Sequence, residues 1–284
     1  MAARVAPSQS TQRTRHAPEP NSHLGSVLDT LREPESLGLP SGDGKLKQPV
    51  RAVGFDLDDT LCVYMPVAHQ ARQQILKQYV VPRVNLPLET VEQHYRTAFK
   101  SILEELHDER WYPLYLREGH PTRTETFRRM LHSLNLPDEA LAEQISREYA
   151  ALREQMLHLH EEALEVLYAL RGRYPLFVIT NGPAYEQRRE LQTLGIEDLF
   201  DIIAIEGEVG IGKPHKPIFE FVQRQLGVPP EQILFVGNSW EHDVQGALGA
   251  GWQAAWINRD NLPHPHPDSP VPMLTNLRQL LERL

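Results

Sequence analysis

Short apolar runs that end abruptly at a polar or glycine residue recur along the chain, and this pattern constrains the fold more than any other feature. The first run spans 50–55 and ends at Asp56. Runs this short and this apolar are typical of strands that are covered on both faces. Helical stretches at 184–194 and 217–226 separate later runs, and each is followed by a glycine suited to a helix end. The alternation predicts a doubly wound parallel α/β sheet, with the other strands at 175–179, 202–205, 233–236 and 254–257.

The interval between the first two predicted strands is too long for one crossover helix. Its residues favour helix almost throughout, at 67–80, 88–106, 124–134 and 138–158, with prolines in the breaks. An all-helical segment of this size indicates a second small domain inserted into the first. We therefore expect a core formed by 49–65 and 157–284, with a helical insert at 66–156.

The segment 1–48 has a different composition, rich in Pro, Ser, Thr and Arg with few apolar residues. Such a sequence buries too little surface to offset its ordering entropy, which predicts a disordered tail. A mitochondrial transit peptide is the alternative, since Arg4, Arg13 and Arg15 occur before any acidic residue. Pro7 and the absence of an apolar helical face argue against it.

Composition narrows the classes of partner and compartment. The 284 residues include 38 acidic and 29 basic side chains, a formal net charge of −9 that disfavours binding to nucleic acid. Cys62 is the one cysteine, so no intramolecular disulfide can form and a reducing compartment is expected. No apolar run is long enough to cross a membrane, and no signal peptide is evident. These features predict a soluble cytoplasmic protein that does not bind membranes.

Polar side chains stand at the carboxyl ends of the predicted strands, where ligands bind in open α/β sheets. Carboxylates in such a place favour a hard cation, and a lysine beside helix N-termini favours an anion. A metal and an anion next to a free carboxylate point to phosphoryl transfer. The residues concerned are Asp56, Asp58, Thr180, Asn181, Lys213, Gly237, Asn238 and Asp243.

Four short motifs in this set resemble those of the haloacid dehalogenase (HAD) superfamily. They read FDLDDTL at 55–61, ITNG at 179–182, GKP at 212–214 and VGNS at 236–239, the last followed by Asp243. The stretch 176–258 is similar to the branch that contains sialic-acid phosphatase and phosphoglycolate phosphatase. The resemblance implies a Rossmann-like core with an inserted helical cap, and a phosphoric monoester hydrolase acting on a small phosphate ester.

The resemblance also implies a role for each catalytic position. Asp56 would attack phosphorus and form an aspartyl-phosphate. Asp58 would protonate the leaving oxygen and later deprotonate the hydrolytic water. Thr180 and backbone amides near Asn181 would hold the transferring oxygens, while Lys213 would balance charge.

The same family carries Mg²⁺, which the Asp56 carboxylate, the Asp58 backbone carbonyl and the fourth motif would hold. One departure matters there, because Asn238 stands where the family usually has an aspartate. An amide oxygen is neutral, so we expect weaker metal binding. Asp243 could compensate, directly or through water.

Two alternatives to a phosphatase stay open. Asp58 favours oxygen leaving groups over halides, yet a phosphomutase needs the same pair of aspartates. A catalytically impaired binding or regulatory protein is the other alternative, with Asn238 as its sequence hint.

Several other sequence patterns suggest a functional site but are interpreted more simply as ordinary structural features. The G-x-x-x-x-G-K sequence at 207–213 is followed by Pro214, which cannot replace the Ser or Thr of a nucleotide-binding loop. Cys62 is expected to be a buried packing thiol, and the His264-Pro-His266 loop to be solvated. Within the insert, an arginine-rich aromatic run could grip an anionic or sugar group of the substrate. An ordinary helix end with solvated arginines is the favoured interpretation of that run, which comprises Arg110, Trp111, Tyr112, Tyr115, Arg117, His120 and Arg123.

Overall fold

A computed structural model describes Leu46 and residues 48–284 of the chain. The tail predicted at 1–48 and its transit-peptide alternative therefore lie outside the described residues, apart from Leu46 and Gln48.

Six parallel strands form one sheet in the order β3-β2-β1-β4-β5-β6. The order reverses direction at β1, which places the carboxyl ends of β1, β2 and β4 together at the switch point of the sheet. The parallel α/β fold predicted from the sequence is confirmed. The sixth strand was not predicted, because two residues are too short to show a pattern. The strands are β1 (Ala52–Phe55), β2 (Leu176–Thr180), β3 (Ile202–Ile205), β4 (Ile233–Gly237), β5 (Gln253–Ile257) and β6 (Met273–Leu274).

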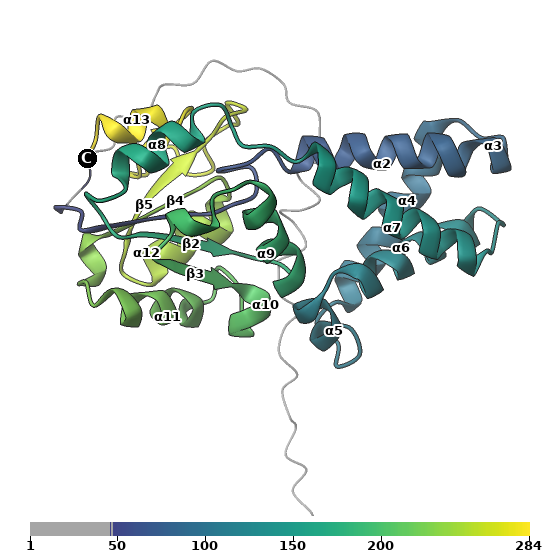
Figure 1. Ribbon diagram of the computed structural model, residues 1–284, viewed down its shortest axis with the longest axis horizontal. Coiled ribbons are helices and arrows are strands. Elements are labelled where there is room, and N and C mark those ends of the chain that lie inside the picture. Colours follow the sequence, from purple (N-terminus) through teal and green to yellow (C-terminus); the bar gives the residue numbers. More distant parts are fainter. Residues whose placement is uncertain (1–45, 47) are drawn as a thin grey trace, which may run out of the picture. The chain divides into compact units, whose positions relative to one another are not determined.

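Helices cover both faces of this sheet (Figure 1). Alternate residues along each strand enter opposite cores: Val178 belongs to one apolar cluster and its neighbours Phe177 and Ile179 belong to the other. Helices α8 and α13 close the first cluster, and α11 and α12 close the second. The core helices are α8 (Ala163–Leu170), α9 (Ala184–Thr193), α10 (Glu206–Val209), α11 (Lys216–Leu226), α12 (Gly246–Gly249) and α13 (Arg278–Leu281), with the 3₁₀ turns η1 (Glu197–Leu199) and η2 (Pro230–Gln232) and the π-helix η3 (Trp240–Gln245).

Packing requires a glycine at position 54, in the middle of β1. Gly54 pairs with Phe177 of β2, and a Cβ atom at position 54 would overlap the Phe177 ring. The absent side chain lets this ring stack on Phe235 and meet Trp252 edge-on, with centroids 6.2 and 5.5 Å away.

Every named element between β1 and α8 is a helix. This segment has an apolar core of its own, to which α2, α4, α6 and α7 all contribute. The expected insertion of helices after the first strand is confirmed, whereas its boundaries at 66 and 156 stay a prediction. The helices are α2 (Met65–Tyr79), α3 (Val81–Val84), α4 (Leu88–Glu105), α5 (Tyr112–Arg117), α6 (His120–Ser133) and α7 (Glu139–Met156). Within the described part of the chain, no helix combines the length and apolar character that crossing a bilayer requires.

Candidate active site

Asp56 directly follows β1 and is joined to a buried lysine. Lys213 Nζ lies 2.6 Å from Asp56 Oδ1 and 2.6 Å from Asp243 Oδ1, so one ammonium links two carboxylates. The other oxygen, Asp56 Oδ2, accepts a hydrogen bond from the Thr60 hydroxyl at 2.9 Å. Asp56 is only 6% exposed, and burial raises its pKa to about 6 even though Lys213 opposes that shift. Burial alone would lower the pKa of Lys213, but Asp243 and Asp56 outweigh it and raise that pKa. A carboxylate and an ammonium therefore face each other near neutral pH.

Asp58, two residues further on, lies at the end of a buried polar network. Gln187 Nε2 donates to Asp58 Oδ2 at 3.3 Å and to Glu190 Oε2 at 3.0 Å. Gln187 Oε1 accepts from the Thr180 hydroxyl at 2.6 Å, and Arg153 donates to Glu190 Oε1 at 3.0 Å. Burial, then Glu190 and Asp56, hold the pKa of Asp58 well above its usual range. A carboxyl group that keeps its proton in this way is suited to act as a general acid.

Two of the three residues expected to bind phosphate, Thr180 at the end of β2 and Asn181 directly after it, make other contacts in the structure. Thr180 is buried with its hydroxyl directed at Gln187. The Asn181 side chain binds the backbone of Lys213, accepting from its N–H at 2.7 Å and donating to its carbonyl at 2.8 Å. Asn181 thus fixes the loop that presents the lysine. The phosphate-binding role predicted for this strand end stays a prediction.

Asn238 follows β4, and its amide oxygen lies beside Asp56. The single hydroxyl of Thr60 lies 2.9 Å from Asp56 Oδ2 and 3.3 Å from Asn238 Oδ1, which brings these two oxygens close together. Trp256 Nε1 donates to the Asn238 carbonyl at 2.7 Å, and the Asn238 N–H donates to Thr60 Oγ1 at 3.0 Å. The Thr60 hydroxyl of the first motif therefore contacts both the backbone N–H and the side-chain oxygen of Asn238.

Asp243, on η3, lies behind the lysine with both carboxylate oxygens engaged. Oδ1 accepts from Lys213, and Oδ2 accepts from the Ser239 N–H at 2.8 Å. A Cβ atom at Gly237 would overlap the Asp243 carboxylate, so glycine at the end of β4 makes this approach possible. In this arrangement Asp243 holds Lys213 in place.

The oxygens near Asp56 fit a hard cation. Among the residues that the structure describes, no three histidine, cysteine or acidic side chains gather as a ligand cluster. A cation here would instead take one carboxylate oxygen of Asp56, the amide oxygen of Asn238 and the main-chain carbonyl oxygen of Asp58. Such all-oxygen sets suit Mg²⁺, which retains several of its waters.

Sequence reasoning missed Gln187, Glu190 and Thr60 as members of the site. Thr60 lay within the first motif, and its spacing from Asp56 was a usable signal. Gln187 and Glu190 showed none, because a glutamine and a glutamate on a polar helix look solvated until the fold buries them at 3% exposure each.

The arginine-rich run of the insert does not offer a free cationic grip. Arg123 lies 3.4 Å from Glu186, His120 lies 3.1 Å from Glu143, and Arg110 stacks over Trp111. Tyr112 turns instead toward the core, where its hydroxyl donates to Glu206 Oε1 at 3.1 Å. Arg110 and Arg117 are exposed, as the plainer interpretation expects, whereas Arg123 is paired with Glu186 and is neither solvated nor free to bind an anion.

Two smaller expectations can also be compared with the structure. Cys62 is fully buried in an apolar cluster, as expected for a packing thiol. Of the two loop histidines, His266 is exposed as predicted, whereas His264 is partly buried, with its ring centroid 4.6 Å from that of Trp240 and 5.1 Å from that of Trp256.

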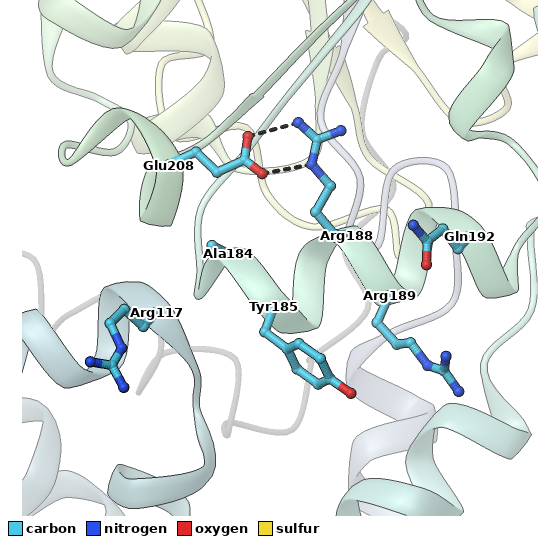
Figure 2. Close-up of a pocket in the computed structure, with 7 residues that line it drawn as sticks. All are labelled: Arg117, Ala184, Tyr185, Arg188, Arg189, Gln192 and Glu208. Carbon is cyan, nitrogen blue, oxygen red and sulfur yellow. Dashed lines mark hydrogen bonds and ion pairs between the residues drawn. The ribbon is translucent and has the colours of Figure 1, made fainter.

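A hollow of about 500 Å³ is lined by residues of α9 together with Arg117 of α5 and Glu208 of α10, and by none of these catalytic positions. Figure 2 shows that one of its arginines is not free, since Arg188 makes a double hydrogen bond with Glu208 at 2.6 and 2.7 Å. The remaining lining includes Arg117, Tyr185 and Arg189.

Comparisons with known proteins identify the family of the chain. Residues 50–251 match the family of haloacid dehalogenase-like hydrolases. The pyrimidine 5'-nucleotidase YjjG of Escherichia coli is 32% identical over 51% of this chain and 68% of its own length. Human N-acylneuraminate-9-phosphatase is 29% identical over 78% of this chain and 88% of its own.

Solved structures show the same fold. The HAD-hydrolase YfnB of Bacillus subtilis, in a magnesium-bound crystal form, superposes with a TM-score of 0.63 at 20% identity, covering 83% of this chain and 98% of that one. A 2-haloacid dehalogenase from Pseudomonas syringae pv. Tomato gives a TM-score of 0.60 at 26% identity, covering 82% and 97%.

Proposed function

Since the chain belongs to the haloacid dehalogenase-like hydrolases, we propose that it is a Mg²⁺-dependent phosphatase of a small phosphorylated metabolite. One observation carries the proposal. A carboxylate held by a buried lysine, Asp56, stands two residues before Asp58, a carboxyl group whose pKa is raised. The first suits a nucleophile and the second suits a general acid, as hydrolysis of an ester requires.

The reaction proceeds in two displacements at phosphorus. An Asp56 oxygen attacks phosphorus while the ester P–O bond breaks, and Asp58 gives its proton to the departing oxygen. Asp58 then takes a proton from water as that water attacks the aspartyl-phosphate, releasing inorganic phosphate and restoring Asp56. Lys213 opposes the negative charge of Asp56 and of the phosphoryl oxygens in both steps.

Mg²⁺ would be held by Asp56, the main-chain carbonyl of Asp58 and Asn238, with Asp243 contributing directly or through water. When bound, it supplies positive charge that lets an anionic nucleophile approach an anionic ester. The magnesium-bound crystal form of YfnB supports this choice of ion. The neutral amide of Asn238 leaves one negative charge fewer at the site than an aspartate would.

The names of the relatives support a small-molecule substrate. Besides the nucleotidase and the N-acylneuraminate phosphatase, they include a glyceraldehyde 3-phosphate phosphatase of Methanopyrus kandleri and a phosphoserine phosphatase of Thermus thermophilus. These substrates share a phosphate ester and differ in the leaving group. A cytoplasmic location and the lack of a nucleic-acid partner stay predictions, the second supported by the net charge of −9.

The test is phosphate release from 4-nitrophenyl phosphate and a panel of metabolite esters, with and without millimolar Mg²⁺. We expect metal-dependent release that is lost in Asp56→Asn, because a neutral amide of similar shape is a poor nucleophile. Conversion of a sugar phosphate to its isomer without release would identify a phosphomutase. No phosphate release from any ester of the panel, and no isomer formed, would identify a catalytically impaired protein and overturn the proposal.

A further inference from the structure

Helix α5 of the insert is in contact with the catalytic edge of the sheet. The Tyr112 hydroxyl donates to Glu206, and the Gly119 N–H just beyond the helix donates to Glu186 Oε2 at 2.8 Å. The Leu116 carbonyl approaches Gly207 so closely that a Cβ atom there would overlap it. The residues of α5 are therefore placed to form a wall of the substrate site.

Glu206 is the core residue that meets this wall, and it lies beside the catalytic loops. Its Oε2 accepts the Gly182 N–H at 3.0 Å. A Cβ atom at Gly212 would lie 2.8 Å from both the Glu206 carboxyl carbon and Asn181 Oδ1. Glu206 thus adjoins Asn181, the residue that fixes the Lys213 loop. It is 8% exposed, and no cation makes a salt bridge with it among the described residues.

Tyr115 stands one turn after Tyr112 on the same helix, with ring centroids 6.5 Å apart. Its hydroxyl makes no hydrogen bond with any residue in the part of the chain that the structure describes. Burial, and then the charge of Glu206, raise the pKa of its phenol well above the usual range. Its ring lies beside that of Tyr112, whose hydroxyl donates to Glu206, so both tyrosines occupy the side of α5 that meets Glu206.

Three cations around this space are each held by a carboxylate. Lys213 bridges Asp56 and Asp243, and Arg153 pairs with Glu190 at 3.0 Å. Arg123 pairs with Glu186. In the hollow beside α9, Arg188 is paired with Glu208 and Arg189 with Glu154, and Arg117 of α5 lies 3.8 Å from Glu118 (Figure 2). A second anionic group on the substrate would meet the Glu206 carboxylate here, and these three paired cations are not free to bind it.

Building on the proposed phosphatase activity, we propose that the leaving group of the substrate is a polyol or amino alcohol without a second anionic group, recognised by Tyr115 and Glu206. The Tyr115 hydroxyl and the Glu206 carboxylate offer a donor and acceptors to hydroxyl or ammonium groups. Repulsion by the Glu206 carboxylate disfavours a carboxylate or a further phosphate at the same place.

Matched pairs of esters test the proposal. Glycerol 3-phosphate is compared with 3-phosphoglycerate, and phosphoethanolamine with phosphoglycolate, each pair differing in one neutral or cationic group against a carboxylate. In wild type we expect kcat/KM for the first member to exceed that for the second by about tenfold or more, the size of one lost polar contact. Equal rates, or preference for the carboxylates, would overturn the inference.

Two variants test whether Glu206 and Tyr115 cause the difference in kcat/KM within each pair of esters. Glu206→Gln keeps the shape and should shrink the ratio within each pair, whereas Glu208→Gln, two residues along α10 and paired with Arg188 at the surface, should leave it unchanged. Tyr115→Phe should lower kcat/KM for glycerol 3-phosphate by about tenfold while sparing 4-nitrophenyl phosphate. If both Glu206→Gln and Tyr115→Phe discriminate as wild type does, these residues do not recognise the leaving group.

The aryl phosphate separates this inference from the function on which it rests. Hydrolysis of 4-nitrophenyl phosphate together with preference for anionic esters would leave the phosphatase standing and remove the leaving-group proposal. Failure to hydrolyse any ester would remove both.

Discussion

The side chain of Asn181 is hydrogen-bonded through both its oxygen and its nitrogen to the backbone of Lys213, at 2.7 and 2.8 Å. Two residues that lie 32 positions apart are thereby locked together at the end of β2. A buried ammonium can contact Asp56 and Asp243 only if its backbone is placed to within a fraction of an ångström. The Asn181 amide provides that placement, so the residue acts on the reaction through the lysine.

Asn181→Ala should therefore lower turnover by about a hundredfold, because loss of a positioning contact misplaces the charge that the reaction needs. A matched control exists in Asn258, whose amide likewise binds the backbone N–H and carbonyl of Leu262, both at 2.9 Å. Asn258→Ala should lose comparable thermal stability and keep most of its turnover. Equal turnover losses in the two variants would show that Asn181 serves only stability.

Asn238→Asp should lower the Mg²⁺ concentration that gives half the maximal rate. The change adds a negative charge to an oxygen already close to Asp56, where a divalent cation gains from it. Asn85→Asp, at an exposed turn of the insert, adds the same charge far from the site and serves as the control. A Mg²⁺ requirement that is unchanged or higher in Asn238→Asp would mean that this position is not a ligand.

Stability in mild acid should depend on His160. Burial, and then Arg259, lower its pKa to about 4 from the usual 6.5. As the pH falls from about 6.5 to about 4, the unfolded chain takes up a proton at this histidine that the folded chain does not, so the free energy of unfolding decreases. His160→Gln should lose less melting temperature over this window than wild type does.

His132, an exposed histidine of the insert, provides the control for that comparison. Thermal melts of His132→Gln should follow the wild-type pH dependence. A His160→Gln variant whose melting temperature falls in parallel with wild type would contradict the assignment.

The fold was largely predictable because its signals are local. Each of the five longer strands is an apolar run with its own endpoint, and the helices of the insert carry their own apolar faces. Strand β6 has only two residues and depends on pairing with β5, so its sequence carries no signal of its own. The short helix α5 was missed for a similar reason, since contacts with the core rather than periodicity place it.

In the site, too, the residues with a local sequence signal were predictable and those placed by tertiary contacts were not. Asp56 and Asp58 were identifiable since they lie in one short motif at a strand end. Gln187 and Glu206 belong to the surroundings of these carboxylates only through contacts between distant segments, 129 residues apart for Gln187 and Asp58. A sequence shows such partners only after the fold has brought them together.

Direct trapping of the phosphoenzyme tests the central claim most sharply. Enzyme turning over a phosphate ester labelled at phosphorus is quenched in acid, and the protein-bound label is mapped to a peptide. The account predicts a label that hydroxylamine removes, as expected for an acyl phosphate, located on the peptide with Asp56 and absent from Asp56→Asn. Steady phosphate release with no label on the protein, or undiminished turnover by Asp56→Asn, would contradict it.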